Sequence, residues 1–174
     1  MTEHIELDDL EGLGAGAIGE PGRRAFYLQA RTEVTQLTVL VEKEQIDLLA
    51  KEAVAFLDRL ADDYPELPVL MSPGDADLRE PTVPLFRARL IGLGFDPERE
   101  LVLIELRERA EEEDDGGGDD DDDDEGYVAR VYATRAQVRA MAARGVEAVA
   151  GGRPPCPLCE QPMDPGGHRC PRWN

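Results

Sequence analysis

The sequence predicts an α+β fold: a mostly antiparallel sheet with two packed helices, followed by a small C-terminal zinc knuckle. Three observations lead to this prediction. Apolar residues alternate by twos along several segments, two other segments have the period of an amphipathic helix, and all three cysteines lie near the C-terminus. A chain of 174 residues suits one core with a small appendage. We therefore expect an α+β domain at residues 1–151 and a zinc-binding tail at residues 152–174.

The first predicted elements are an antiparallel hairpin and a helix. Alternation predicts strands at residues 26–31 and 34–41, and the short polar link between them is typical of a hairpin. From residue 44 the apolar period becomes that of an amphipathic helix, which ends before Pro65. The apolar stripe of this helix consists of Ile46, Leu49, Ala53, Phe56, Leu57 and Leu60.

Strands and a helix follow again after a proline-rich loop at residues 66–84. Thr134 and Gln137 stand at the spacing of a capping box, which marks the start of the second helix. The apolar side of that helix consists of Val138, Met141, Ala142 and Val149. The strands before it are predicted by alternation at residues 86–90, 101–106 and 127–133, with a turn at residues 95–98.

The two predicted helices begin with similar sequences. Residues 43–46 read Lys-Glu-Gln-Ile and residues 135–138 read Arg-Ala-Gln-Val, and apolar residues follow at the same spacing. An internal duplication of a β-β-α unit explains this match, and so does chance similarity between two amphipathic helix starts. Two such units would form one mostly antiparallel sheet, whose other face is either wet or paired with a second sheet.

An acidic run at residues 111–125 dominates the net charge of −19. It holds twelve acids and no base, which leaves 26 acids against 19 bases in the rest of the chain. Because such a run repels itself and has nothing to bury, we expect a disordered, solvated loop. A calcium-binding loop is an alternative, but aligning Gly126 with its glycine places Tyr132 where a glutamate is required. Mimicry of a phosphate backbone toward a basic partner is a third interpretation.

The sequence contains no cofactor or catalytic motif that its context supports. Gly14, Gly16 and Gly19 have the spacing of a dinucleotide-binding loop, but a proline and a strand follow where a helix must begin. We interpret these residues as a flexible glycine-rich lead-in and assign no cofactor. The only histidines are His4, near the N-terminus, and His168, in the tail, and sequence spacing selects no pair of catalytic carboxylates.

Arginines on the predicted strands are candidates for an anion pocket. Arg87, Arg89, Arg107, Arg109 and Arg130 lie on or beside these strands. Guanidinium groups bind phosphate and carboxylate well, although arginines in such positions more often form a solvent-exposed face.

The tail carries the most specific motif of the chain. Cys156 and Cys159 form a C-x-x-C knuckle, and His168 and Cys170 follow after a reversal at residues 164–167. Thiolate and imidazole ligands favour tetrahedral zinc, and four protein ligands leave no open position, so we expect a structural site. Bound iron or a free thiol pair are the alternatives. A thioredoxin-like redox motif fits poorly, because prolines on both sides of the first cysteine oppose the helix that it requires.

Several specific motifs are spread over nearly the whole chain. They are Gly19-Glu20-Pro21-Gly22-Arg23-Arg24 with Phe26, Leu28 and Gln29; Glu42-Lys43-Glu44-Gln45; residues 86–96; Gly152-Arg153-Pro154-Pro155-Cys156-Pro157-Leu158-Cys159; and Asp164-Pro165, Gly167-His168, Cys170-Pro171-Arg172 and Asn174. Together these motifs resemble a family of uncharacterised actinobacterial proteins, DUF3090. In similar proteins a glycine usually follows the second cysteine of the knuckle, where this chain has Glu160. The family has no established activity, so the resemblance implies no catalytic residues.

These observations favour a noncatalytic protein-binding or adaptor domain with a structural zinc site. The alternative is an enzyme or ligand-binding protein that acts on a phosphorylated or anionic small metabolite. The sequence argues against nucleic acid as a partner, because the three arginines of the tail are few against an acidic body. No stretch approaches the roughly 20 apolar residues that cross a membrane, and the N-terminus is acidic. We expect a cytoplasmic protein, since clustered free cysteines suit a reducing compartment.

Overall fold

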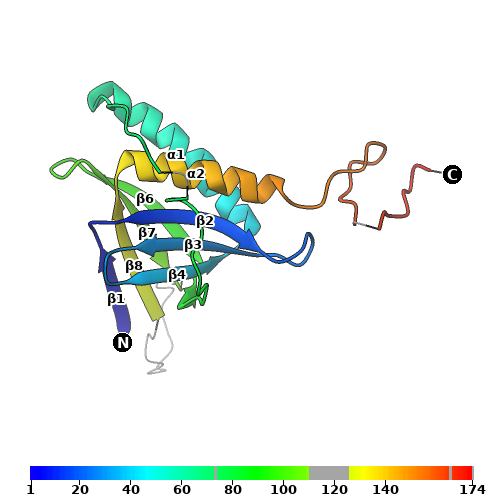
Figure 1. Ribbon diagram of the computed structural model, residues 1–174, viewed down its shortest axis with the longest axis horizontal. Coiled ribbons are helices and arrows are strands. Elements are labelled where there is room, and N and C mark those ends of the chain that lie inside the picture. The colour runs from blue at the N-terminus through cyan, green and yellow to red at the C-terminus, as the bar shows by residue number, and fades with distance from the viewer. Residues whose placement is uncertain (73, 110–125, 165, 174) are drawn as a thin grey trace, which may run out of the picture.

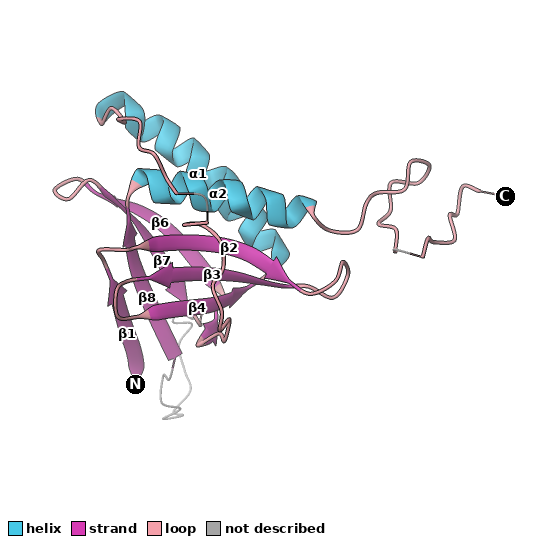
Figure 2. Cartoon of the chain, in the orientation of Figure 1, coloured by secondary structure: helices cyan, strands magenta, loops and turns pink. Residues whose placement is uncertain are grey.

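The computed structural model describes residues 1–72, 74–109, 126–164 and 166–173. Within these residues the chain forms eight strands in two sheets and two helices packed beside them (Figures 1 and 2). The elements are β1 (Thr2–Leu7), β2 (Gly12–Ile18), β3 (Ala25–Arg31), β4 (Gln36–Val41), α1 (Lys43–Asp63), β5 (Phe86–Arg87), β6 (Leu90–Asp96), β7 (Leu101–Arg107), β8 (Gly126–Ala133) and α2 (Arg135–Ala150). The predicted α+β class is confirmed.

The two sheets have the same design. One has the strand order β2-β3-β4-β5 and the other the order β1-β8-β7-β6. In each sheet three consecutive strands form an antiparallel meander, and a fourth strand joins the last of them in parallel, β5 beside β4 and β1 beside β8. The strands are thus mostly antiparallel, as predicted, but they form two sheets rather than the single sheet expected from two β-β-α units.

The hydrophobic core lies between the sheets. A void of about 10 Å³ is lined by side chains of both, such as Leu28 and Val39 from one sheet and Ile104 and Val131 from the other. Val39, Ile104 and Val131 are each at most 2% exposed. Burial of alternate residues on facing strands therefore supplies the main stabilising term, as the period of two predicts.

Both helices begin at the predicted positions. The Thr134 backbone N–H donates to Gln137 Oε1 at 2.9 Å, and Gln137 N–H donates to Thr134 Oγ1 at 3.2 Å, which confirms the capping box. The helices contact each other closely at Gly145, where a Cβ atom would lie 3.2 Å from Ile46 Cγ2. Four residues of the predicted α1 stripe are buried and two, Phe56 and Leu60, are half-buried.

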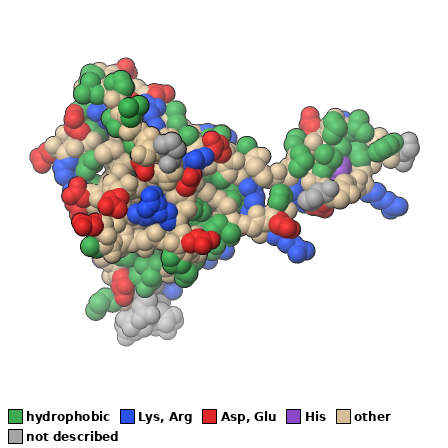
Figure 3. All heavy atoms as spheres, in the orientation of Figure 1, with side chains coloured by type: hydrophobic (Ala, Val, Ile, Leu, Met, Phe, Trp, Pro, Cys, Tyr) green, Lys and Arg blue, Asp and Glu red, His purple; other side chains and the backbone are tan. Residues whose placement is uncertain are grey.

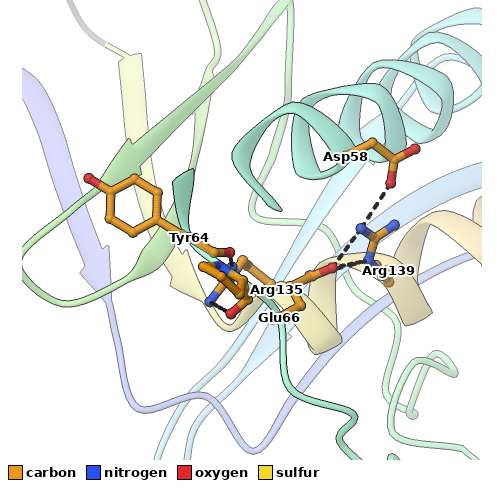
Figure 4. A network of polar contacts seen from close by, with 6 residues as sticks. Asp58, Tyr64, Glu66, Arg135 and Arg139 are labelled. Carbon is orange, nitrogen blue, oxygen red and sulfur yellow. Dashed lines mark hydrogen bonds and ion pairs between the residues drawn. The ribbon is translucent and has the colours of Figure 1, made fainter. Parts of the chain in front are cut away.

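Polar contacts join the end of α1 to the start of α2 (Figure 4). Arg139 lies between Glu66 and Asp58, at 2.7 and 3.0 Å from their carboxylates, and the Glu66 carboxylate raises its pKa. Arg135 donates hydrogen bonds to the carbonyls of Tyr64 and Pro65. A guanidinium at these carbonyls complements the negative end of the α1 dipole.

One predicted strand is divided between the sheets. Sequence alternation predicted a strand at residues 86–90, but β5 ends at Arg87 and β6 begins at Leu90. Ala88 N–H donates to Leu40 O in one sheet, and Arg89 N–H donates to Arg107 O in the other. The chain thus crosses between sheets within two residues, a change that alternation does not record. The turn that follows β6 is held by Asp96, whose side chain accepts from two backbone N–H groups.

The predicted flexible glycine-rich lead-in is also wrong, because Gly14 and Gly16 lie within strand β2 and Gly19 directly follows it. Gly12, Gly14 and Gly16 lie on the face of β2 against which residues 75–78 pack. A Cβ atom at Gly14 would lie 2.9 Å from the carbonyl oxygens of Ala76 and Asp77. The glycines therefore admit a second backbone at close range rather than a dinucleotide.

A buried arginine holds this covering segment in place. Arg31 is 4% exposed, and its guanidinium donates to the carbonyls of Asp77 at 2.9 Å and Asp75 at 2.7 Å. Burial lowers the pKa of Arg31, and its Nε has no partner among the described residues. Its neighbour Gln29, 1% exposed, donates to Arg79 O at 2.9 Å. The segment from 75 to 79 is thereby tied to the outer face of the sheet.

His4 lies in strand β1, where it pairs with Val128 of β8. None of the helices among the described residues is both long and apolar enough to span a bilayer.

Candidate metal centre

The C-terminal tail begins where α2 ends and extends away from the sheets (Figure 1). A small hairpin opens it, since Pro155 and Pro162 form an isolated antiparallel bridge. Cys156 N–H donates to Gln161 O at 2.8 Å, and Glu160 N–H donates to Cys156 O at 2.8 Å. These bonds close a loop that carries both cysteines of the C-x-x-C pair.

Glu160 adopts the left-handed backbone conformation, with φ of 61°. This conformation costs an L-residue with a Cβ atom about 1 kcal/mol and costs glycine nothing. The position that follows the second cysteine therefore suits glycine, which is the residue that similar proteins usually have there. Glu160 keeps the turn by accepting some backbone strain.

The second half of the tail returns to the first. Gly167 N–H donates to Asp164 O at 2.8 Å and Gly167 has φ of 90°, so a turn joins the two ends of the predicted reversal. Pro165, inside that reversal, lies outside the described residues. Arg172 donates to Leu158 O at 3.1 Å and ties the chain end to the knuckle loop.

Four donor atoms converge in this tail. The Sγ atoms of Cys156, Cys159 and Cys170 and a ring nitrogen of His168 all lie within 4.8 Å of one another. The Sγ atoms of Cys156 and Cys170 are 3.9 Å apart, whereas a tetrahedron with bonds of about 2.3 Å has edges of about 3.8 Å. Cys159 Sγ lies 3.2 Å from His168 Nε2. This group can hold a metal ion at its centre.

The local backbone favours a thiolate at the first cysteine. The N–H groups of Cys159 and Leu158 point at the Cys156 sulfur and hold the pKa of this thiol below its ordinary value. At Cys159 the N–H of Gln161 acts in the same direction, but burial and the neighbouring thiols outweigh it and raise the pKa. Three thiols so close together favour a cation that neutralises their charge when they ionise.

A comparison with protein families identifies the family of the chain. The model of a family described as "Protein of unknown function (DUF3090)" matches residues 5–170. The chain belongs to the DUF3090 family. The match includes all four donor residues of this DUF3090 protein, and the family description gives no activity. No curated protein and no solved structure matches the chain.

The strand arginines do not form one pocket. Arg107 and Arg130 both bind Glu105, at 2.7 and 2.8 Å, and their guanidinium groups lower the pKa of that carboxyl group. Arg87 lies elsewhere, on β5, and contacts Glu42. Glu105 therefore balances charge on one sheet face. The acidic run at residues 111–125 lies outside the described residues.

A separate basic cluster was missed in the sequence. Arg24, Lys43, Arg87 and Arg153 line one cavity of about 380 Å³ beside the start of α1. Only Arg87 was among the predicted candidates. The other three come from segments far apart in the chain, and no spacing rule joins a residue before β3 to one after α2. The cavity does not include the metal donors.

Proposed function

We propose that Cys156, Cys159, His168 and Cys170 bind one structural zinc ion in a noncatalytic protein-binding or adaptor protein. The observation that carries the proposal is the convergence of three sulfurs and one imidazole nitrogen within 4.8 Å. Sulfur-rich tetrahedral sites favour zinc over the hard cations that prefer oxygen ligands. With four protein ligands, such a zinc ion has no open position for substrate or water.

Zinc would supply the cohesion that the tail lacks. Among the described residues of the tail, 152–164 and 166–173, Cys156 is the one buried apolar side chain, so this part of the tail has almost no core of its own. Metal binding in so small a unit is coupled to its folding. We include in the proposal a division of the chain into an α+β domain at residues 1–151 and a zinc-binding tail at residues 152–174.

The surface of the tail supports a protein partner. Trp173 is 78% exposed and Leu158 is 50% exposed, and Figure 3 shows hydrophobic side chains gathered over the tail. Exposed tryptophan is common among residues that dominate binding energy at protein interfaces. A net charge of −19 opposes binding to nucleic acid. Because zinc thiolates require reduced cysteines, we place this function in the cytoplasm.

Metal analysis tests the zinc site. Purified protein from cells grown with several available metals is expected to contain about one equivalent of zinc. The double variant His168→Ala/Cys170→Ala is expected to contain almost none, whereas His4→Ala, which removes the other histidine, retains the wild-type amount. Wild-type protein without metal in the reduced state, or wild-type zinc content in the double variant, contradicts the site.

Affinity capture tests the adaptor role. We expect full-length protein to recover a stoichiometric protein partner from extract of the native cell, and Trp173→Ala to lose it. Leu70→Ala is the control, since Leu70 is a fully exposed apolar side chain on the body rather than the tail. Equal recovery of the partner by wild type and Trp173→Ala, or loss with both variants, argues against docking through the tail.

A further inference from the structure

A cavity beside α1 gathers basic side chains in an acidic protein. It has a volume of about 380 Å³, which lies in the range of small-molecule sites. Four cations line it, each from a different part of the chain: Arg24 precedes β3, Lys43 begins α1, Arg87 ends β5 and Arg153 follows α2. Two carboxylates, Glu42 and Glu44, also line it. The cavity is therefore locally positive although the chain carries a charge of −19.

Two of these cations are already neutralised. Arg87 binds the Glu42 carboxylate at 2.6 Å, and Arg153 binds Asp164 at 3.0 Å. Both pairs are partly exposed to solvent, so they contribute little stability on their own. They hold two guanidinium groups in the cavity lining and remove Glu42 as a competitor for the other cations.

The other two cations have no carboxylate partner among the described residues. Arg24 donates to Ala148 O at 2.7 Å, and its guanidinium lies over the Phe26 ring, 5.0 Å from the ring centre. These contacts fix the side chain, and the Ala148 carbonyl in the last turn of α2 offsets only part of its charge. Lys43 makes no ion pair or hydrogen bond within the described part of the chain, and Glu44 beside it is exposed and equally unpaired.

Arg24 and Lys43 converge on one point above Gly152. A Cβ atom at Gly152 would lie 2.9 Å from Arg24 Nη2 and 3.6 Å from Lys43 Nζ. Val149 O lies 3.5 Å from the same Cβ position, and the two cations repel each other less when an anion lies between them. Gly152 leaves the point open, since any larger residue would fill it.

We propose that this cavity binds a small phosphorylated metabolite, with its phosphate held by Arg24 and Lys43 above Gly152. Arg is suited to bidentate contact with phosphate oxygens, and Lys supplies a compact second charge. Arg87 and Arg153 also line the cavity, and the remaining volume accommodates the organic part of the ligand. The site shares no residue with the proposed zinc ligands, so the two proposals can be tested independently.

Amide chemical shifts of the full-length protein test the site. Inorganic phosphate and ribose 5-phosphate are titrated separately at constant ionic strength, with chloride as the reference anion. We expect saturable shifts at Gly22, Lys43 and Gly152, and tighter binding of ribose 5-phosphate than of phosphate. Shifts that do not saturate, or that spread evenly over basic residues, overturn the proposal. Equal affinity for the two probes overturns the assignment of an organic ligand.

Matched variants separate the site from general electrostatics. Lys43→Gln and Arg24→Gln are each expected to weaken ribose 5-phosphate binding by roughly 10- to 100-fold, the range for a lost charged hydrogen bond. Lys51→Gln removes the same charge from the same helix, where Lys51 pairs with Asp47 at 2.6 Å, and is expected to bind normally. Gly152→Val changes no charge but fills the phosphate position and is expected to abolish binding. Equal weakening by Lys43→Gln and Lys51→Gln, or normal binding by Gly152→Val, overturns the proposal.

Discussion

Individual glycines set where backbones meet in this protein. Gly14 in β2 and Gly92 in β6 occupy the same place in their meanders, each as the first residue of a Gly-x-Gly triplet. Their surroundings differ, because Gly14 is buried under the segment that Arg31 holds, whereas Gly92 is exposed. One glycine is therefore required by packing and the other is not.

Substitution of these two glycines separates packing from intrinsic strand preference. Gly14→Ala is expected to lower the free energy of unfolding by about 1–3 kcal/mol, because its Cβ would meet two carbonyl oxygens at 2.9 Å. Gly92→Ala is the control: the nearest atom to its Cβ is 4.0 Å away, so the same measurement should change by at most about 0.5 kcal/mol. Urea denaturation measures both. Equal effects contradict the covering-segment account.

Residue type alone predicted the role of the candidate metal donors better than it predicted the role of the glycines. Cysteine and histidine side chains offer the same metal-binding atoms in any fold. Their spacing therefore predicted a cluster that the structure brings together. A glycine records only that a side chain is absent. Whether Gly14 faces phosphate, solvent or another backbone depends on residues 75–78, which lie about sixty positions further along the chain.

At the scale of elements, a glutamine in each helix cap binds a segment that connects the two sheets. Gln137 Nε2 donates to Leu10 O at 2.7 Å, in the link between β1 and β2. Gln45 holds the corresponding position in α1 and donates to the carbonyls of Ala88 and Arg89 at 3.2 Å, in the link between β5 and β6. Gln45 Oε1 also accepts from the Glu42 N–H at 2.8 Å. Each capping glutamine thus holds the connection that leads into a meander.

Removal of the two glutamines is expected to have unequal effects. Gln137 is 8% exposed, so Gln137→Ala leaves Leu10 O and Thr134 N–H without partners in a buried place and should cost about 2–3 kcal/mol. Gln45 is more exposed and its links are longer, so Gln45→Ala should cost about 1 kcal/mol. Chemical denaturation of both variants checks this order. A larger loss for Gln45→Ala is the contrary result.

Periodicity predicted the helices well because their burial follows from one face of one element. Ile46, Leu57 and Met141 are buried as expected. The division between β5 and β6 was not predicted, since Ala88 is buried, at 2% exposed, and the apolar alternation continues through it. Its cause is tertiary: the neighbours of Ala88 and Arg89 belong to different sheets. Local sequence carries no signal for that choice.

The whole molecule repeats one pattern of four strands and a helix. β1 to α1 form the first copy and β5 to α2 the second. The first strand of each copy joins the sheet of the other, as β1 pairs with β8 and β5 with β4. The repeated unit is thus longer than the β-β-α unit predicted from the helix starts. Exchange of the first strands ties the two halves into one core.

The acidic run falls where the two copies differ in length. β7 begins 76 residues after β3, whereas α2 begins 92 residues after α1. The additional sixteen residues equal the length of segment 110–125. The first copy makes the corresponding connection with residues 32–35 alone. By its position in the sequence, segment 110–125 is therefore an insertion between two strands that a short turn could connect.

Replacement of residues 110–125 by a short Gly-Ser turn tests this interpretation. The free energy of unfolding is expected to stay the same or to rise by about 1 kcal/mol, because a shorter connection between β7 and β8 closes at lower entropic cost and the chain loses twelve like charges. A variant with the same length and neutral residues separates charge from length. Loss of more than about 2 kcal/mol on replacement shows that the segment supports the fold.

Sequence predicted one of the two candidate sites. The four candidate metal donors lie within fifteen residues, so local spacing reveals them. The basic cavity joins Arg24, Lys43 and Gly152 across more than a hundred residues, and each alone resembles an ordinary surface residue. Such a site follows only from the packing of β3, α1 and the tail.

The central claim is that three sulfurs and one imidazole nitrogen surround a single zinc ion. X-ray absorption at the zinc edge of the purified full-length protein tests it most directly. We predict three sulfur atoms at about 2.3 Å and one nitrogen at about 2.0–2.1 Å, with no oxygen in the first coordination shell. A shell with fewer than three sulfurs, or with a bound water, contradicts a closed structural site at Cys156, Cys159, His168 and Cys170.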